Sequence, residues 1–146
     1  MQLTLHTDYA LRALVYLAVA PERSASVGEI AEAYAISKDH LLKVVQRLGA
    51  LGYVETRRGR AGGVSLLVEP EAIHVGEVVR QLESSLALVE CLGDDPACAI
   101  AGACGLTSVL REARDRFLGI LDEHTIADCV RSRPRVAALL QIQPRR

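Results

Sequence analysis

The chain has 146 residues, half of them apolar, only 3% of them aromatic, and a net charge of −1. This length accommodates one domain, or one domain with an extension, and the apolar content allows an aliphatic core of the kind that favours helices. The near-neutral charge does not by itself indicate a nucleic-acid binder, and no apolar run approaches the length of a membrane span.

The first apolar stretch imitates a secretory signal peptide, because it ends in the small residues Ala18-Val19-Ala20. No Lys or Arg precedes this stretch, and Asp8 and Arg12 interrupt it, which argues against a signal peptide. We therefore expect a cytoplasmic protein with no membrane partner.

The first predicted helix spans residues 6–20. Thr7 or His6 is expected near its N-terminal cap, and Pro21 ends it because proline cannot continue a helix. The spacing of the apolar residues predicts one buried stripe, formed by Tyr9, Leu11, Leu14, Val15 and Ala18.

Two further helices follow, with a very short connection between them. Ser26 and Glu29 have the spacing of a capping box, which places the second helix at residues 27–34, and Ser37 caps a third helix over residues 38–51. The apolar face of the third helix holds Leu41, Leu42, Val44, Val45 and Leu48. Its opposite face holds Lys38, Asp39, His40, Lys43, Gln46 and Arg47. This pattern is typical of a helix-turn-helix, although ordinary helical hairpins share it.

A basic hairpin is predicted directly after the third helix. Gly52 ends the helix, and residues 53–56 and 64–68 have the pattern of strands. The connection between them reads Arg57-Arg58-Gly59-Arg60-Ala61-Gly62-Gly63. Clustered arginines repel one another unless an anion meets them, and glycines let the backbone approach phosphates or the minor groove. The hairpin therefore completes a winged helix-turn-helix.

The charges of the chain are unevenly distributed. Residues 37–63 hold six Lys or Arg and two Asp or Glu, a local net charge of +4, which leaves −5 for the rest. A basic patch on an otherwise acidic protein is the electrostatic footprint of a DNA binder. We therefore predict double-stranded DNA as a partner, contacted by Ser37, Lys38, His40, Lys43, Gln46, Arg47, Arg57, Arg58, Arg60, Gly62 and Gly63.

The second half of the chain is predicted to hold a fourth helix over residues 74–84, an irregular loop over 90–104 and a long helix over 104–126. The apolar residues of the long helix recur at spacings of four and three, a seam that suits packing against another helix. This seam comprises Leu106, Leu110, Ala113, Phe117, Ile120 and His124, widened by Val109 and Leu121. Packing inside the monomer would satisfy the seam, but a palindromic operator favours a homodimer. The tail, 136–140, is predicted to dock on a neighbouring element.

The predicted fold class is mainly α with a small β-hairpin wing, extended by a long dimerisation helix. We expect a winged helix-turn-helix domain over residues 1–70, a connecting helix with a cysteine loop over 71–103, and the dimerisation helix with its tail over 104–146.

Three of the four cysteines lie in the irregular loop. Cys91, Cys98 and Cys104 have the spacing C-x6-C-x5-C, and clustered thiols in a cytoplasmic chain indicate metal or redox chemistry. The spacing is wider than the tight cysteine pairs of zinc sites and fits an iron–sulfur cluster better, with three free thiols as the alternative. Cys129 is predicted to be a small buried apolar residue and not a ligand.

Three thiolates leave one position on such a metal centre open. The candidate fourth ligands are Asp8, His6, His124 or an external molecule. An oxygen ligand is held less firmly by iron than a thiolate, so nitric oxide, oxygen or a small thiol would attack first at that position.

Several motifs occur together and in order: the opening residues 1–4, the segment 7–14, the Arg-Gly-Arg-containing wing 58–63, and the three loop cysteines. On these residues the chain resembles the IscR/NsrR/RirA family of bacterial iron–sulfur regulators, over about residues 1–140. The segments 78–83, 88–91 and 124–128 are most similar to the nitric-oxide-sensing NsrR branch of that family. The ligands that this resemblance implies for a [4Fe-4S] cluster are Cys91, Cys98 and Cys104 of one subunit and Asp8 of the other. Arg12 lies one helical turn from Asp8 and could form an ion pair with it beside the cluster, with a solvated surface charge as the alternative.

The resemblance implies a homodimeric repressor whose operator affinity depends on the cluster and whose signal is nitric oxide. An iron-availability sensor of the RirA type is an alternative, because such sensors share the Arg-Gly-Arg wing and the sequence Cys104-Gly105-Leu106. A redox-sensing IscR-like protein with a [2Fe-2S] cluster is a further alternative, but it would offer a His soon after the third cysteine, and residues 105–110 contain none.

Two other classes of function compete with this interpretation. A redox enzyme is disfavoured because the sequence holds no C-x-x-C motif, no substrate-pocket motif and no paired acid and base. An adaptor that kept the fold but lost DNA binding would not need the arginines of the wing.

Overall fold

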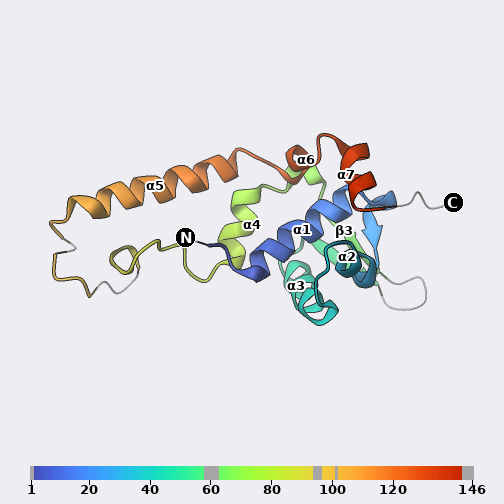
Figure 1. The fold of residues 1–146 in the computed structure, drawn as a ribbon, viewed down its shortest axis with the longest axis horizontal. Helices are drawn as coiled ribbons and strands as arrows, with labels where there is room; N and C mark the ends of the chain where they lie inside the picture. Colours follow the sequence, from blue (N-terminus) through green and yellow to red (C-terminus); the bar gives the residue numbers. More distant parts are fainter. Residues whose placement is uncertain (1, 58–62, 94–96, 101, 143–146) are drawn as a thin grey trace.

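The computed structural model describes residues 2–57, 63–93, 97–100 and 102–142, so Arg58, Arg60 and Gly62 of the predicted wing lie outside the described residues. A helical body surrounds the central helix α1 (Leu5–Val19), and the long helix α5 (Gly105–Asp122) projects away from it (Figure 1). The described residues are mainly helical with one small antiparallel sheet, which confirms the predicted fold class. None of the described helices is long and apolar enough to cross a membrane.

Helix α1 is buried on more than one side. Its buried residues are Thr7, Ala10, Ala13, Leu14, Tyr16, Leu17, Ala18 and Val19. Tyr9, Leu11 and Val15 of the predicted stripe are only partly buried. The single-stripe prediction was wrong because α3, α4, α6, α7 and β3 all contact this helix, so burial does not follow one face.

The N-terminal cap of α1 is Thr4, and His6 and Thr7 lie near it, in the first turn of the helix, as predicted. The Thr4 hydroxyl accepts a hydrogen bond from the Thr7 backbone N–H at 3.3 Å. At the other end the helix stops before Pro21, as predicted, and the short helix η1 (Pro21–Arg23) follows.

The helix-turn-helix consists of α2 (Val27–Ala33) and α3 (Lys38–Ala50). The capping box is confirmed: the Ser26 hydroxyl accepts from the Glu29 N–H at 3.1 Å, and the Glu29 carboxylate accepts from the Ser26 N–H at 2.6 Å. Ser37 occupies the N-cap position of α3. The buried face of α3 consists of Leu41, Val44, Val45 and Leu48, whereas Leu42 is 39% exposed, contrary to the prediction.

The wing consists of strands β2 (Val54–Arg57) and β3 (Gly63–Leu66), which pair antiparallel. A strand that the sequence did not reveal, β1 (Ser24–Ala25), pairs with the other side of β3, so the order is β1-β3-β2. A Cβ atom on Gly63 would stand 2.9 Å from the carbonyl oxygen of Ala25. Glycine at this position therefore lets β1 approach β3 closely, a structural role besides the predicted contact with DNA.

The chain leaves the wing through the short helix η2 (Pro70–Ala72) and enters α4 (Val75–Leu82), close to the predicted fourth helix. The cysteine-rich segment then contains the short helix η3 (Glu90–Leu92) and leads into α5.

The long helix ends at Asp122, four residues before the predicted boundary at residue 126. A separate helix, α6 (Ile126–Cys129), begins after a capping box formed by Thr125 and Asp128, which turns the chain out of the helix axis. The prediction that Cys129 is buried was also wrong, because its side chain is exposed.

The C-terminal tail forms α7 (Arg133–Leu139), which packs against α1. Val136 and Leu140 contact the hydrophobic core, which confirms the predicted docking of the tail.

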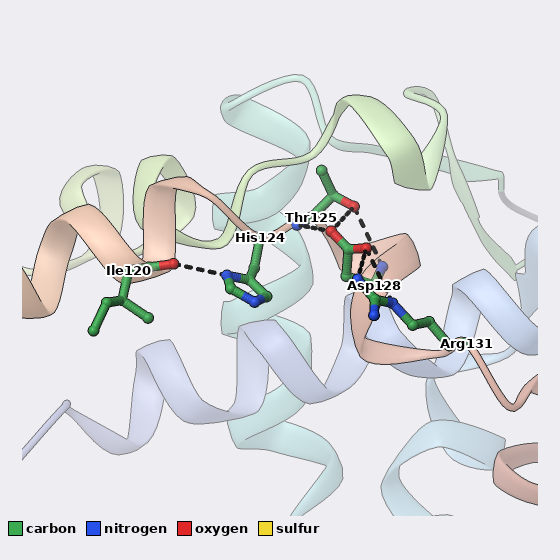
Figure 2. Close-up of polar contacts among 5 residues, drawn as sticks. All are labelled: Ile120, His124, Thr125, Asp128 and Arg131. Atoms are coloured by element: carbon green, nitrogen blue, oxygen red, sulfur yellow. Dashed lines mark hydrogen bonds and ion pairs between the residues drawn. The ribbon is translucent and has the colours of Figure 1, made fainter.

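Asp128 fastens the turn between α5 and α6 (Figure 2). Its carboxylate accepts hydrogen bonds from the backbone N–H of Thr125 at 2.9 Å and from the Thr125 hydroxyl at 3.0 Å, and it pairs with Arg131 at 2.8 Å. These contacts, the backbone hydrogen bond first, hold the pKa of Asp128 well below its ordinary value. A carboxylate with a lowered folded pKa stabilises the fold above its unfolded pKa, and this contribution is lost as the pH falls through the folded value.

We therefore expect Asp128→Asn, which keeps one acceptor oxygen but removes the charge that Thr125 and Arg131 contact, to lower the Tm by about 2–4 °C at pH 7, the usual effect of a weakened helix cap in a chain of this size. The difference from the wild type should shrink below about pH 4, where the unfolded Asp is protonated. Thermal unfolding followed by circular dichroism between pH 3 and 8 measures both effects. Glu123→Gln, a change of the same charge at an exposed carboxylate nearby, is the control.

Candidate DNA-binding face and cysteine-rich segment

The polar face of α3 is exposed along its whole length. The exposed side chains are Ser37, Lys38, Asp39, His40, Lys43, Gln46 and Arg47. The opposite face packs against α1 and α2, so the core fixes which residues point outward. A helix with cations and amide groups on its free face can donate hydrogen bonds to base edges and to phosphates.

Two of the predicted DNA-binding arginines have partners within the chain. The Arg47 guanidinium donates to the carbonyl oxygen of Gln81 at 3.2 Å, which ties α3 to the end of α4. The Arg57 guanidinium pairs with Glu55 on the same strand at 2.7 Å. Lys38 and Lys43 have no hydrogen bond or ion pair among the described residues, so their charges are available to an external anion.

Asp8 and Arg12 form the ion pair that their spacing predicts. The guanidinium Nε donates to Oδ1 at 3.0 Å, and Nη2 lies 2.8 Å from Oδ2, so both carboxylate oxygens are held. The side chains of Asp8 and Arg12 are 38% and 45% exposed, and the guanidinium lies 5.8 Å from the ring centre of Tyr34. The Asp8 carboxylate is therefore fixed in orientation and still open to solvent.

Two of the three loop cysteines lie at the N-terminal end of α5. Cys104 is the N-cap residue of the helix, and its thiol is half-buried. Cys91 lies in η3, which packs against α5, and its sulfur is 3.7 Å from the hydroxyl oxygen of the buried Thr107 in the first helical turn. Thr107 was not predicted as a site residue, because it lies 16 residues from Cys91 in the sequence and no local pattern joins the two.

Cys98 is exposed and lies in the short described segment 97–100. All four cysteines are free thiols, so none is consumed by a disulfide. Within the described residues, no three Cys, His, Asp or Glu side chains are grouped closely enough to hold one metal ion. A single chain therefore supplies soft thiolate donors of the right chemistry for an iron–sulfur cluster but does not assemble them with Asp8.

His124, one of the alternative fourth ligands, lies at the opposite end of α5 from Cys104. Its Nδ1 atom is 2.9 Å from the carbonyl oxygen of Ile120 (Figure 2). A helix of 18 residues is about 27 Å long, so His124 does not reach Cys104 of the same chain.

The fourth cysteine, Cys129, lies on α6, well separated from the other three along the fold. Its surroundings remove part of the water around the sulfur, and together with the Asp128 carboxylate they raise the pKa of the thiol. A thiol that stays protonated is a poor metal ligand, which agrees with leaving Cys129 out of the predicted ligand set.

Part of the apolar seam of α5 is left uncovered in the single chain, whereas Leu110, Phe117 and Leu121 are partly buried. Leu106 and Val109 are each 61% exposed and Ile120 is 59% exposed. Of the two alternatives, packing inside the monomer is therefore wrong for these residues. An apolar strip of this length on a projecting helix is the kind of surface that a partner covers.

The comparisons with known proteins agree with this architecture. The model of the Rrf2 family, described as an iron-dependent transcriptional regulator, matches residues 3–132. The HTH-type transcriptional regulator NsrR of Bacillus subtilis (strain 168) is 46% identical over 145 residues, which are 98% of this chain and 99% of that protein. NsrR of Shouchella clausii (strain KSM-K16) is also 46% identical over 145 residues, 98% of this chain and 97% of that protein.

Solved structures of more distant relatives have the same fold. IscR of T. potens has a TM-score of 0.70 at 26% identity, over 90% of this chain and 88% of that one. CymR, the global cysteine regulator of B. subtilis, has a TM-score of 0.70 at 28% identity, over 88% of this chain and 95% of that one. The family match and the relatives show that the chain belongs to the Rrf2 family. It is a DNA-binding transcriptional regulator and not an enzyme.

Proposed function

We propose that this regulator is a homodimeric repressor whose affinity for a palindromic operator depends on an iron–sulfur cluster that responds to nitric oxide. Five relatives named NsrR, 43–46% identical over nearly the whole chain, support the proposal. The observation that carries it is the placement of two free thiols, Cys91 and Cys104, at the N-terminal end of the exposed helix α5.

In this proposal the α3 helices of the two subunits enter successive major grooves of one operator. The α3 residues that face DNA are Ser37, Lys38, His40, Lys43, Gln46 and Arg47. Arg57, Arg58, Arg60, Gly62 and Gly63 of the wing reach the phosphate backbone or the minor groove. The exposed cations of α3 support this assignment, because phosphate neutralisation supplies much of the affinity for duplex DNA.

The proposed cluster ligands are Cys91, Cys98 and Cys104 of one subunit with the partner subunit's Asp8, and a [4Fe-4S] cluster is favoured over [2Fe-2S]. A bound cluster supplies iron that reacts with nitric oxide. The Thr107 hydroxyl lies 3.7 Å from the Cys91 sulfur and holds that side chain beside the first turn of α5, close to Cys104. Arg12 holds the partly exposed Asp8 carboxylate in a fixed orientation. In this position Asp8 is accessible to a cluster bound by the cysteines of the other subunit.

The exposed seam of α5 is the proposed dimer contact. Leu106, Val109 and Ile120 would each be removed from water by the α5 helix of a second copy. Isologous pairing of this kind gives the two-fold symmetry that a palindromic operator requires.

The proposal is tested with full-length protein purified without oxygen. Absorbance and Mössbauer spectra identify the cluster, and nitric oxide is then titrated while binding is measured to a duplex selected by the protein from a random library. We expect affinity to fall at least about 10-fold, since a regulatory coupling is commonly worth this much. Unchanged affinity after complete reaction with nitric oxide would contradict the proposal.

The iron dependence in the family's description favours one second candidate, a sensor of iron availability. Such a sensor loses its cluster and its DNA affinity when an iron chelator is added. Nitric oxide alone, at the concentrations of the titration, leaves both unchanged. A parallel titration with chelator therefore separates the two signals.

A further inference from the structure

The projecting helix α5 is joined to α4 at the end opposite to Cys104. Its last residue, Asp122, forms an ion pair with Arg80 through both carboxylate oxygens, with Oδ2 at 2.6 Å from the guanidinium Nη2. The carbonyl oxygen of the same Asp122 lies 2.9 Å from Nδ1 of His74. Two residues of the winged-helix body thus hold one residue of the arm.

Backbone hydrogen bonds also join the residues just before α4 to the residues just after α5. His74 and Thr125 form an antiparallel bridge, in which the Val75 N–H donates to the His124 carbonyl at 2.9 Å and the Ile126 N–H donates to the Ile73 carbonyl at 2.9 Å. Backbone pairing of this kind leaves little rotational freedom between the start of α4 and the end of α5. These bonds set the angle at which the arm projects from the body (Figure 1).

Gly76 allows the two helices to come this close. A Cβ atom at this position would stand 2.8 Å from Cγ and 2.9 Å from the backbone nitrogen of Asp122. Real Cβ atoms do not approach backbone atoms so closely, so any other residue would push α5 away from α4. The contact is thus built into the packing and does not depend on the surface ion pair alone.

Beyond this joint α5 packs against η3 at its far end, and Phe117 and Leu118 lie beside Leu3 and residues 85–88, while Leu106, Val109 and Ile120 are exposed. A helix of 18 residues is about 27 Å long, so a rotation of about 10° at the joint would displace its far end by about 5 Å. This displacement exceeds the roughly 3.4 Å between successive base pairs of DNA. A small change at the joint would therefore alter where the second recognition helix falls on the operator.

We propose that Gly76, Arg80 and Asp122 form a joint that determines which half-site spacing the dimer accepts. This inference rests on the proposed function, in which α5 pairs with the α5 helix of a second copy. The three residues lie on α4 and α5 and not on the DNA-facing side of α3. They therefore act on operator choice by positioning the two recognition helices and not by touching DNA.

The test is selection of binding sites from a random duplex library by full-length, oxygen-free protein, followed by affinity measurements on inverted repeats whose spacing differs by one base pair either way. We expect the variants Asp122→Asn and Arg80→Gln to select the same half-site sequence as the wild type. The ratio of their affinities for the preferred spacing and for a spacing one base pair away should be at least about 10-fold smaller than in the wild type. Gly76→Ala is expected to move the preferred spacing and not to broaden it. The matched control is Glu69→Gln, which removes the Arg23–Glu69 ion pair inside the body and leaves the joint intact.

The outcomes separate the joint from the dimer model. If Asp122→Asn and Arg80→Gln both stay dimeric in sedimentation and keep the wild-type discrimination between spacings, the joint does not determine spacing. The inference also fails if either variant weakens binding to an isolated half-site as much as to the full operator, because the effect then lies in the folding of the body. Selection of single half-sites by a monomeric wild type would instead overturn the proposed function and the inference with it.

Discussion

Serine at any one of Cys91, Cys98 and Cys104 is expected to abolish the iron–sulfur cluster. Serine is nearly isosteric with cysteine, but its oxygen is a hard, weakly acidic donor that replaces a thiolate poorly on iron. We expect the iron content of protein purified without oxygen to fall from about four per subunit, the value for a [4Fe-4S] cluster, to well below one. Metal analysis and visible absorbance measure this loss, and DNA affinity should fall at least about 10-fold in parallel.

Cys129→Ser is the matched control for these three variants. The Cys129 thiol is also free and exposed, but it lies on α6, and the pKa of its thiol is raised. We expect full iron content and wild-type DNA binding in this variant. A cluster that persists in one of the three loop variants but is lost in Cys129→Ser would show that the ligand set has been assigned wrongly.

The second large effect is expected on the recognition helix. Lys43 and Gln46 are both exposed on the polar face of α3. A good base contact is worth about 1–3 kcal/mol, so the double substitution Lys43→Ala/Gln46→Ala should weaken operator binding by about 100-fold or more. Fluorescence anisotropy with the selected operator, repeated at several salt concentrations, measures the loss. It also shows whether the salt dependence falls by about one ion, as the loss of a single phosphate contact predicts.

Arg135→Ala on α7 is the control for lost charge, because it removes an exposed cation outside the helix-turn-helix. Its operator affinity should stay within about twofold of the wild type. An affinity loss for the double variant of less than threefold would rule out α3 as the helix that reads the operator. Arg47 is a less suitable test, because its guanidinium also ties α3 to the Gln81 carbonyl, and its loss would disturb the fold as well.

Local rules were sufficient for several parts of the structure. The capping box of Ser26 and Glu29 depends on residues three positions apart, and the Asp8–Arg12 ion pair on residues one helical turn apart. The exposed face of α3 followed from helical periodicity, because the apolar residues of one face had to be buried. The cysteine spacing likewise indicated the kind of metal chemistry from the donor types alone.

Other features depended on residues far apart in the sequence. Strand β1 is two residues long, too short for any periodicity, and it exists because β3 offers an unpaired edge that Gly63 lets it approach. Burial of α1 on several faces could not be read from one stripe, because five other elements decide it. A Gly inside an amphipathic helix was the only local sign of the joint between Gly76 and Asp122.

By itself, then, the sequence determined helices α1 to α4, the capping box of α2, the polar face of α3 and the thiol donors, because each depends on neighbouring residues or on side-chain chemistry. Only the tertiary structure decided that α5 projects as an arm and that Leu106, Val109 and Ile120 of its seam are exposed. It also placed Cys91 beside Thr107 at the start of that arm. These facts follow from contacts between distant segments, whose closeness no local pattern records.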